Sequence, residues 1–164
     1  SGKSTVLRAL AWLMKGVWLN QDEFSHFGRG AKHKFLDAIK HAAVQASGVT
    51  KPIFVDKINT MSQHRQEIVQ ALGTSKDGAS CFRILLRFMH PLDPPGRVGS
   101  HGLKLCTERI ASRGKAHRTL MGDNPKLAEI LRRTASGFEA PSSSELSGFN
   151  AVLDVDITRP AAQS

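Results

Sequence analysis

The sequence predicts an α/β protein whose parallel sheet is covered by helices on both faces. Short apolar runs that end in polar residues alternate with longer stretches in which apolar residues recur at helical spacing. Strands that alternate with helices in this way usually form βαβ units, in which the strands run parallel. The 164 residues fit one domain of ordinary size and contain no evident internal repeat, so we expect one domain over 1–164.

In the first half of the chain the pattern predicts helices and strands in alternation. Apolar residues at spacings of three and four predict helices at 4–14, 32–46 and 61–72. Compact apolar runs predict buried strands at 17–20 and 52–55, and polar residues follow each of them directly. The glycine-bearing segment 25–30 is predicted to be a loop.

The second half continues the alternation with less regular spacing. Strands are predicted at 82–89 and 151–157, and helices at 102–112 and 125–133. Arg83 and Arg87 indicate that the first of these strands is less buried than the two before it. Segments rich in turn residues predict loops at 91–99 and, at the surface, 142–144.

The charge of the chain is strongly positive and unevenly placed. Lys and Arg together number 23 against 14 Asp and Glu, which gives a formal net charge of +9. The segment Arg83–Arg133 holds 11 basic and 4 acidic residues, so most of the excess lies there. A concentrated positive field favours polyanionic partners such as nucleic acid or a nucleotide.

Several classes of protein are disfavoured. No apolar run approaches the roughly 20 residues of a membrane-spanning helix, so we expect no membrane segment. Cys81 and Cys106 lack metal-ligand spacing, and we interpret them as reduced thiols of an intracellular protein, nuclear or cytoplasmic. Trp12 and Trp18 are assigned to packing in the core or at its rim, not to base stacking.

The chain opens on a phosphate-binding pattern. Gly2-Lys3-Ser4-Thr5 matches the second half of GxxxxGK[ST], and an amphipathic helix follows at once. In such a loop Lys3 would neutralise the β- and γ-phosphates, Ser4 would ligate Mg²⁺, and Thr5 would assist more weakly. The first glycine and the preceding strand are absent, so we expect an N-terminally truncated domain. The alternative is a solvated turn that caps a surface helix.

Two acidic positions follow the predicted strands of the first half. Asp22 lies after the strand 17–20, where the carboxyl ends of parallel strands line a ligand crevice. There it would accept the proton of an attacking hydroxyl, with Glu23 as the weaker candidate. Asp56 closes the run Ile53–Val55, as in a Walker B element that holds Mg²⁺. Solvated turns at strand ends would also explain these acids.

A basic cluster in the second half has the composition of a lid. Arg109, Arg113, Lys115 and Arg118 surround Gly114 within residues 102–122. A mobile segment of this kind could close over phosphates and stabilise the charge of a transferring group. A solvated basic helix face is the alternative interpretation.

Taken in order, four motifs resemble the kinase domain of fungal-type tRNA ligase. These are GKST at 2–5, WLNQDE at 18–23, VDKIN at 55–59 with QHR at 63–65, and SRGKAHRT at 112–119. The resemblance covers the chain from Gly2 to about Asp156 and implies an adenylate-kinase-like P-loop fold, a three-layer sandwich. It also implies transfer of the γ-phosphate of ATP or GTP to the 5′-OH of a cleaved tRNA exon, with Mg²⁺ as cofactor. In that family, ligase and cyclic phosphodiesterase domains are linked to the kinase in one chain.

By this resemblance, Lys3, Asp22 and Arg113 are catalytic, and Gly2, Ser4, Thr5 and Arg109 join Lys3 and Arg113 in binding nucleotide. Asp56, Asn59 and Arg65 would surround the RNA end, and Ser4 and Asp56 would hold the metal. The sequence departs from the family at Glu23 and Ile58, where the family has Asp and Asn. Two alternatives remain: a P-loop kinase of a small metabolite, and a non-catalytic RNA-binding remnant.

Overall fold

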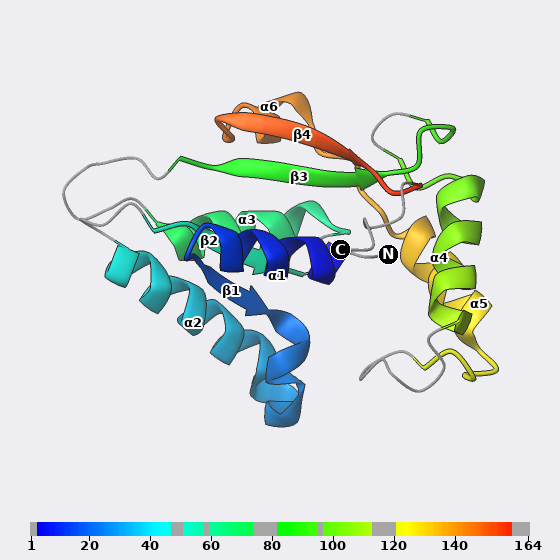
Figure 1. Cartoon of the computed structure of the whole chain (residues 1–164), viewed down its shortest axis with the longest axis horizontal. Helices are drawn as coiled ribbons and strands as arrows, with labels where there is room; N and C mark the ends of the chain where they lie inside the picture. The colour runs from blue at the N-terminus through cyan, green and yellow to red at the C-terminus, as the bar shows by residue number, and fades with distance from the viewer. Residues whose placement is uncertain are drawn as a thin grey trace. The chain divides into compact units, whose positions relative to one another are not determined.

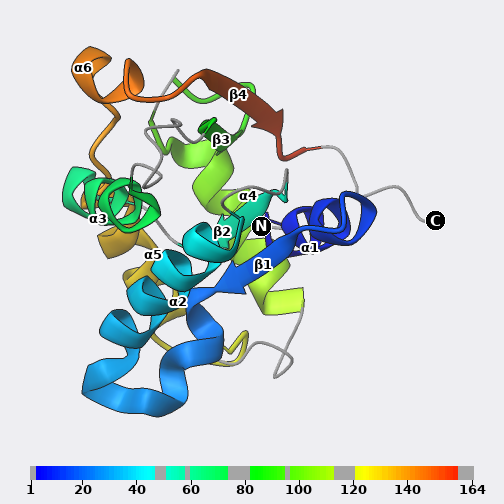
Figure 2. The same ribbon diagram turned by 90° about the vertical axis from the view of Figure 1, so that its left-hand side faces the viewer.

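The computed structural model describes residues 3–46, 51–57, 60–73, 82–94, 97–112 and 121–158. The chain folds into two compact units. The N-terminal unit comprises Gly2–Asn59 and Gln63–Phe82, and the C-terminal unit comprises Thr60–Ser62 and Arg83–Ser164. Both contain helices and parallel strands, which confirms the α/β class at that level (Figures 1 and 2).

The N-terminal unit is built around the parallel pair β1 (Val17–Asn20) and β2 (Ile53–Asp56). Around this pair lie α1 (Lys3–Leu13), the 3₁₀ helix η1 (Gln21–Gly30), α2 (Ala31–Ala46) and α3 (Ser62–Leu72). The register pairs Val17 with Ile53 and Asn20 with Asp56, so both strands end at the same edge. That edge is where ligands bind in open parallel sheets.

Apolar side chains of α2 and α3 form the core of this unit. Phe35 and Ile39 are fully buried, and Ile68 and Ala71 pack with them against half-buried residues of the strands. Gly16 joins α1 to β1 at a point where a Cβ would lie 2.6 Å from the Pro52 carbonyl oxygen, closer than any side chain tolerates. Trp12, assigned to packing from the sequence, is instead 81% exposed, because it lies on the outer face of α1.

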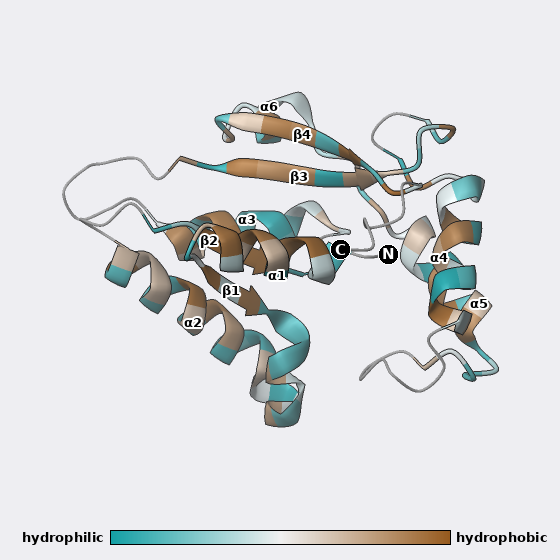
Figure 3. Cartoon of the chain, viewed as in Figure 1, coloured by the Kyte–Doolittle hydropathy of each residue, from teal (hydrophilic) through white to brown (hydrophobic). Residues whose placement is uncertain are grey.

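The C-terminal unit contains a second parallel pair, β3 (Ile84–Met89) and β4 (Ala151–Asp156). Its helices are α4 (Ser100–Ser112), α5 (Leu127–Ser136) and α6 (Ser143–Leu146). The two strands lie side by side in Figure 1, and Figure 3 shows apolar residues along β3. Arg87 interrupts that run and binds Asp154 of β4 through Nε and Nη2, at 2.6 and 2.8 Å.

Three sequence predictions of local structure are corrected. The expected loop 25–30 belongs to η1, which Asn20 caps by accepting the N–H of Asp22 at 2.9 Å. The expected loop 142–144 begins α6, because Ser142 Oγ accepts the N–H of Glu145 at 3.2 Å. Within the described ranges, the strands form two sheets of two strands each, not one continuous sheet.

The remaining elements lie within a few residues of their predicted bounds. The largest shift is at α5, which begins two residues after the predicted start and ends at Ser136. None of the helices in the described ranges has both the length and the apolar character that a membrane span requires.

Candidate functional site

A cavity of about 270 Å³ opens at the edge where β1 and β2 both end. Nearly all of its lining side chains are polar, and they come from α1, β1, η1, the start of α2 and the end of β2. They are Lys3, Asn20, Gln21, Asp22, Ser25, Ala31, Asp56 and Lys57. We call this feature the strand-edge cavity. The parallel pairing of β1 with β2 brings the residues together, because its register aligns Asn20 with Asp56.

Lys3 and Asp56 form an ion pair across the cavity, although 53 residues separate them in the sequence. The ammonium donates to Asp56 Oδ1, and the Asp56 side chain is completely buried while that of Lys3 is 25% exposed. Asp56 Oδ2 is also buried and has no hydrogen-bond partner among the described residues. A buried carboxylate oxygen without a donor is costly, so this atom marks a place where a cation or a donor can bind.

The charges of the cavity are mutually dependent. Burial lowers the pKa of Lys3, and the nearby negative charge of Asp22 partly opposes that effect. Asp22 follows the η1 cap made by Asn20, which fixes its backbone where the side chain lines the cavity. The cavity is therefore lined by two lysines and two carboxylates, a combination suited to polar, charged ligands.

Lys57 is a cavity residue that the sequence analysis did not select. It is 8% exposed, and burial lowers its pKa while Glu67 raises it. Glu67 itself accepts a hydrogen bond from Lys32 at 2.6 Å. In the sequence, Lys57 is marked only by its position directly after Asp56. A buried and an exposed lysine at such a position cannot be told apart from sequence.

The structure brings together some of the predicted site residues and leaves others apart. Lys3, Asp22 and Asp56 share the cavity, whereas Ser4 is half-buried, Thr5 is exposed, and neither is among the described residues that line it. Arg65 of α3 is buried, at 4% exposure, and is not one of the described lining residues either.

The other predicted positions lie in the C-terminal unit or outside the described residues. Arg109 is a half-buried residue of α4, in the C-terminal unit. Gly2, Asn59 and Arg113 lie outside the described residues, as do Lys115 and Arg118. The roles assigned to all of these residues stay predictions.

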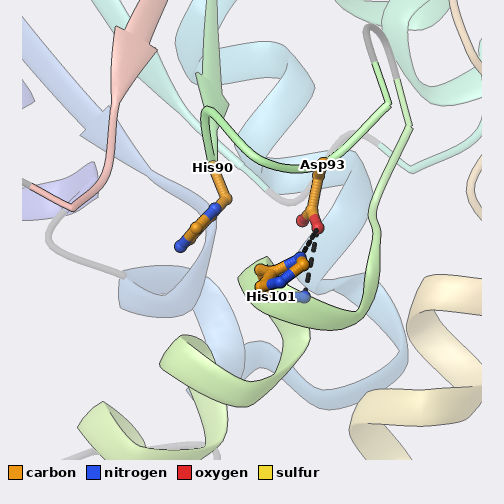
Figure 4. A group of neighbouring side chains, drawn as sticks. All are labelled: His90, Asp93 and His101. Carbon is orange, nitrogen blue, oxygen red and sulfur yellow. Dashed lines mark hydrogen bonds and ion pairs between the residues drawn. The ribbon is translucent and has the colours of Figure 1, made fainter.

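A second polar cluster lies in the C-terminal unit, in the turn between β3 and α4 (Figure 4). His90, Asp93 and His101 place one ligand atom each within 4.8 Å of one another. Asp93 is 9% exposed and accepts backbone N–H groups from Gly99, His101 and Gly102. The sequence shows no regular histidine spacing that would indicate this cluster, because the fold of the turn brings its residues together.

Comparison with protein-family models, with curated proteins and with solved structures finds no match to this chain. The site must therefore be interpreted from its own residues.

Proposed function

We propose that the chain is the P-loop kinase module of an RNA-repair enzyme, which transfers the γ-phosphate of ATP or GTP to a 5′-OH end of RNA. One observation carries this proposal. Lys3, Asp22 and Asp56 come from separate segments, and each was selected from sequence for a different part of phosphoryl transfer; all three line the strand-edge cavity. The parallel register places Asp22 and Asp56 at the same strand edge, and Lys3 of α1 joins them there.

The phosphate groups of the donor would bind beside Lys3. This residue is the first of the 11-residue helix α1, and its side chain lines the cavity. Helix N-termini attract anions through their free N–H groups and dipole. Burial already disfavours the charged form of Lys3 and lowers its pKa, and incoming phosphate would offset that cost.

Asp56 fits a magnesium ligand because Oδ2 is buried, has no hydrogen-bond partner in the described part of the chain and belongs to a cavity-lining side chain. Mg²⁺ prefers oxygen ligands and usually takes one or two protein carboxylates together with phosphate oxygens. When bound, the ion would neutralise charge on the β- and γ-phosphates. Asp56 would hold it, and Lys3 would then divide its charge between Asp56 and the phosphates.

Asp22 would act as the general base. Its carboxylate accepts the proton of the attacking 5′-hydroxyl while that oxygen forms a bond to the γ-phosphorus and the bond from the γ-phosphorus to the β–γ bridging oxygen breaks. The resulting diphosphate leaves with the electron pair of the broken bond. The basic segment Arg83–Arg133, with 11 basic and 4 acidic residues, supports a polyanionic acceptor over a small neutral alcohol.

The test is transfer of labelled γ-phosphate to a 5′-OH RNA oligonucleotide, compared with a panel of nucleosides. We expect Lys3→Ala and Asp22→Ala each to reduce the rate at least about 100-fold. Lys34→Ala is the matched control, since Lys34 is exposed and is not among the described residues that line the cavity.

The outcomes separate three functions. Transfer to RNA that depends on Lys3 and Asp22 supports the proposal. Transfer to a nucleoside but not to RNA would indicate a kinase of a small metabolite. RNA binding without transfer to any acceptor would indicate a non-catalytic remnant, and full activity in Asp22→Ala would remove the base assignment.

A further inference from the structure

We propose that His90, Asp93 and His101 form a binding site for a transition-metal cation of the zinc class, separate from the strand-edge cavity. The three residues bracket the connection from β3 to α4: His90 directly follows Met89, Asp93 lies in the turn, and His101 is in the first turn of α4. An ion bound to them would tie the end of the strand to the start of the helix (Figure 4).

The donor set is the first reason. Two imidazoles and one carboxylate are the ligands that zinc sites combine, usually with water in the fourth position. The two imidazole rings are nearly parallel, with an interplanar angle of 22° and ring centroids 5.3 Å apart. Figure 4 shows His101 below the Asp93 carboxylate, with His90 at the end of β3. Mg²⁺ would not favour this nitrogen-rich set.

The second reason is the spacing of the atoms. His101 Nδ1 and Asp93 Oδ1 are 3.3 Å apart, which is long for a hydrogen bond. Two ligands about 2.0–2.1 Å from a tetrahedral ion are separated by about 3.3 Å, so this pair already has the spacing of two zinc ligands. All three donor atoms lie within 4.8 Å of one another.

The third reason is how firmly the carboxylate is held. The Asp93 carboxylate accepts the backbone N–H groups of Gly99, His101 and Gly102, at 3.1, 3.1 and 2.8 Å. Metal-ligating carboxylates are commonly oriented by such neighbouring hydrogen bonds. His90 Nδ1 accepts the N–H of Leu92 at 3.2 Å, and His101 is half-exposed, so the two rings can exchange these contacts for an ion.

Glycines at positions 99 and 102 allow the backbone to approach the Asp93 carboxylate closely. A Cβ on Gly99 would collide with Asp93 Oδ1, and one on Gly102 would lie 2.6 Å from Oδ2. The carboxylate is therefore fixed before any ion binds, and the side chains of His90 and His101 would move to reach the ion. Fixed ligands reduce the ordering cost of binding.

The experiment is titration of the full chain with Zn²⁺ by calorimetry, in the presence of excess Mg²⁺. We expect one equivalent of zinc to bind and to raise the Tm, because an ion that binds only the folded state stabilises it. His90→Asn and His101→Asn should each weaken zinc binding at least about tenfold and remove the Tm increase. Far-UV circular dichroism establishes that both variants are folded.

His33→Asn is the matched control. His33 lies 3.6 Å from Asp37 on α2, so it offers a similar histidine–aspartate pair, which has no third ligand within the described ranges. The proposal would be overturned if the wild type did not bind zinc, or if the His90 and His101 variants bound zinc as well as the wild type. Loss of zinc binding in His33→Asn would overturn it too. If either variant is unfolded, ¹H–¹⁵N spectra of the wild-type imidazoles decide: zinc must shift two histidines, and shifts at others would refute the site.

Discussion

Two buried aspartates are stabilised by different groups: Asp56 of the N-terminal unit, the last residue of β2, and Asp93 of the C-terminal unit, which lies just after β3. Asp56 is paired with one ammonium group through Oδ1, and no described residue donates a hydrogen bond to its Oδ2. Asp93 accepts three backbone N–H groups, and its Oδ1 lies 3.3 Å from His101 Nδ1. A carboxylate held by one mobile cation can exchange that partner for a ligand. One held by backbone groups is fixed, and its neighbours must move instead.

This difference suits different cations. The strand-edge cavity offers Asp22, Asn20 and Ser25 as further oxygen groups, which match a hard ion such as Mg²⁺ with phosphate. The turn around Asp93 offers two imidazole nitrogens, which match zinc. Three stability measurements test whether the two aspartates differ in this way, and a fourth tests the Lys32–Glu67 pair beside the cavity.

The greatest loss of stability is expected from Lys3→Ala. It leaves the completely buried Asp56 without its counter-charge, and we expect the free energy of unfolding at pH 7 to fall by about 2–3 kcal/mol. The value is below that of a fully buried pair because Lys3 is partly solvated. Urea denaturation measures it, and the double variant Lys3→Ala/Asp56→Asn should recover part of the loss. A loss no greater than that of Lys34→Ala would contradict the ion pair.

Asp93→Ala should lower stability by about 2 kcal/mol, because it leaves the first N–H groups of α4 without an acceptor. Asp93→Asn keeps one acceptor oxygen and should fall between the wild type and the alanine variant. Thermal unfolding of the three proteins without added metal provides the order. Equal Tm values for all three would show that the turn does not depend on this carboxylate.

Gly102→Ala tests how tightly Asp93 is enclosed. The new Cβ would lie 2.6 Å from Asp93 Oδ2, so we expect a loss of about 1–2 kcal/mol as the carboxylate is displaced. Gly30→Ala is the control, since no atom of the described residues lies within 4 Å of the Cβ there. Chemical denaturation of both variants compares them, and similar stabilities would mean that the turn relaxes freely.

The weakest response is expected from Lys32→Gln, beside the strand-edge cavity. The hydrogen bond from Lys32 holds the pKa of Glu67 below its ordinary value of 4.5. The pair therefore stabilises the fold above that pH, and the contribution is lost as the pH falls through the lowered pKa. We expect a loss of about 0.5 kcal/mol at pH 7 in Lys32→Gln and none in strong acid. A loss of equal size at both pH values would exclude the charge interaction.

Much of the local structure could be predicted from sequence because it depends on local periodicity. The spacing of Leu7 and Ala11 on α1 and of Phe35 and Ile39 on α2 selects the buried face of each helix. The acid after each strand of the first half, Asp22 or Asp56, could likewise be placed at a strand edge. α6 could have been predicted as well, because Ser142 and Glu145 have capping-box spacing.

The amino-acid sequence alone was enough to predict the α/β class, the order of β1 to β4 and of α1 to α5, and the position of Lys3, Asp22 and Asp56 next to helix or strand ends. Three features became visible only in the folded chain: Lys3 pairs with Asp56 across 53 residues, Lys57 is buried, and His90 and His101 meet at Asp93. The cause of this division is the range of the interactions. Helical and strand periodicity arise from neighbouring residues, whereas burial and charge pairing depend on which distant segments the core brings together.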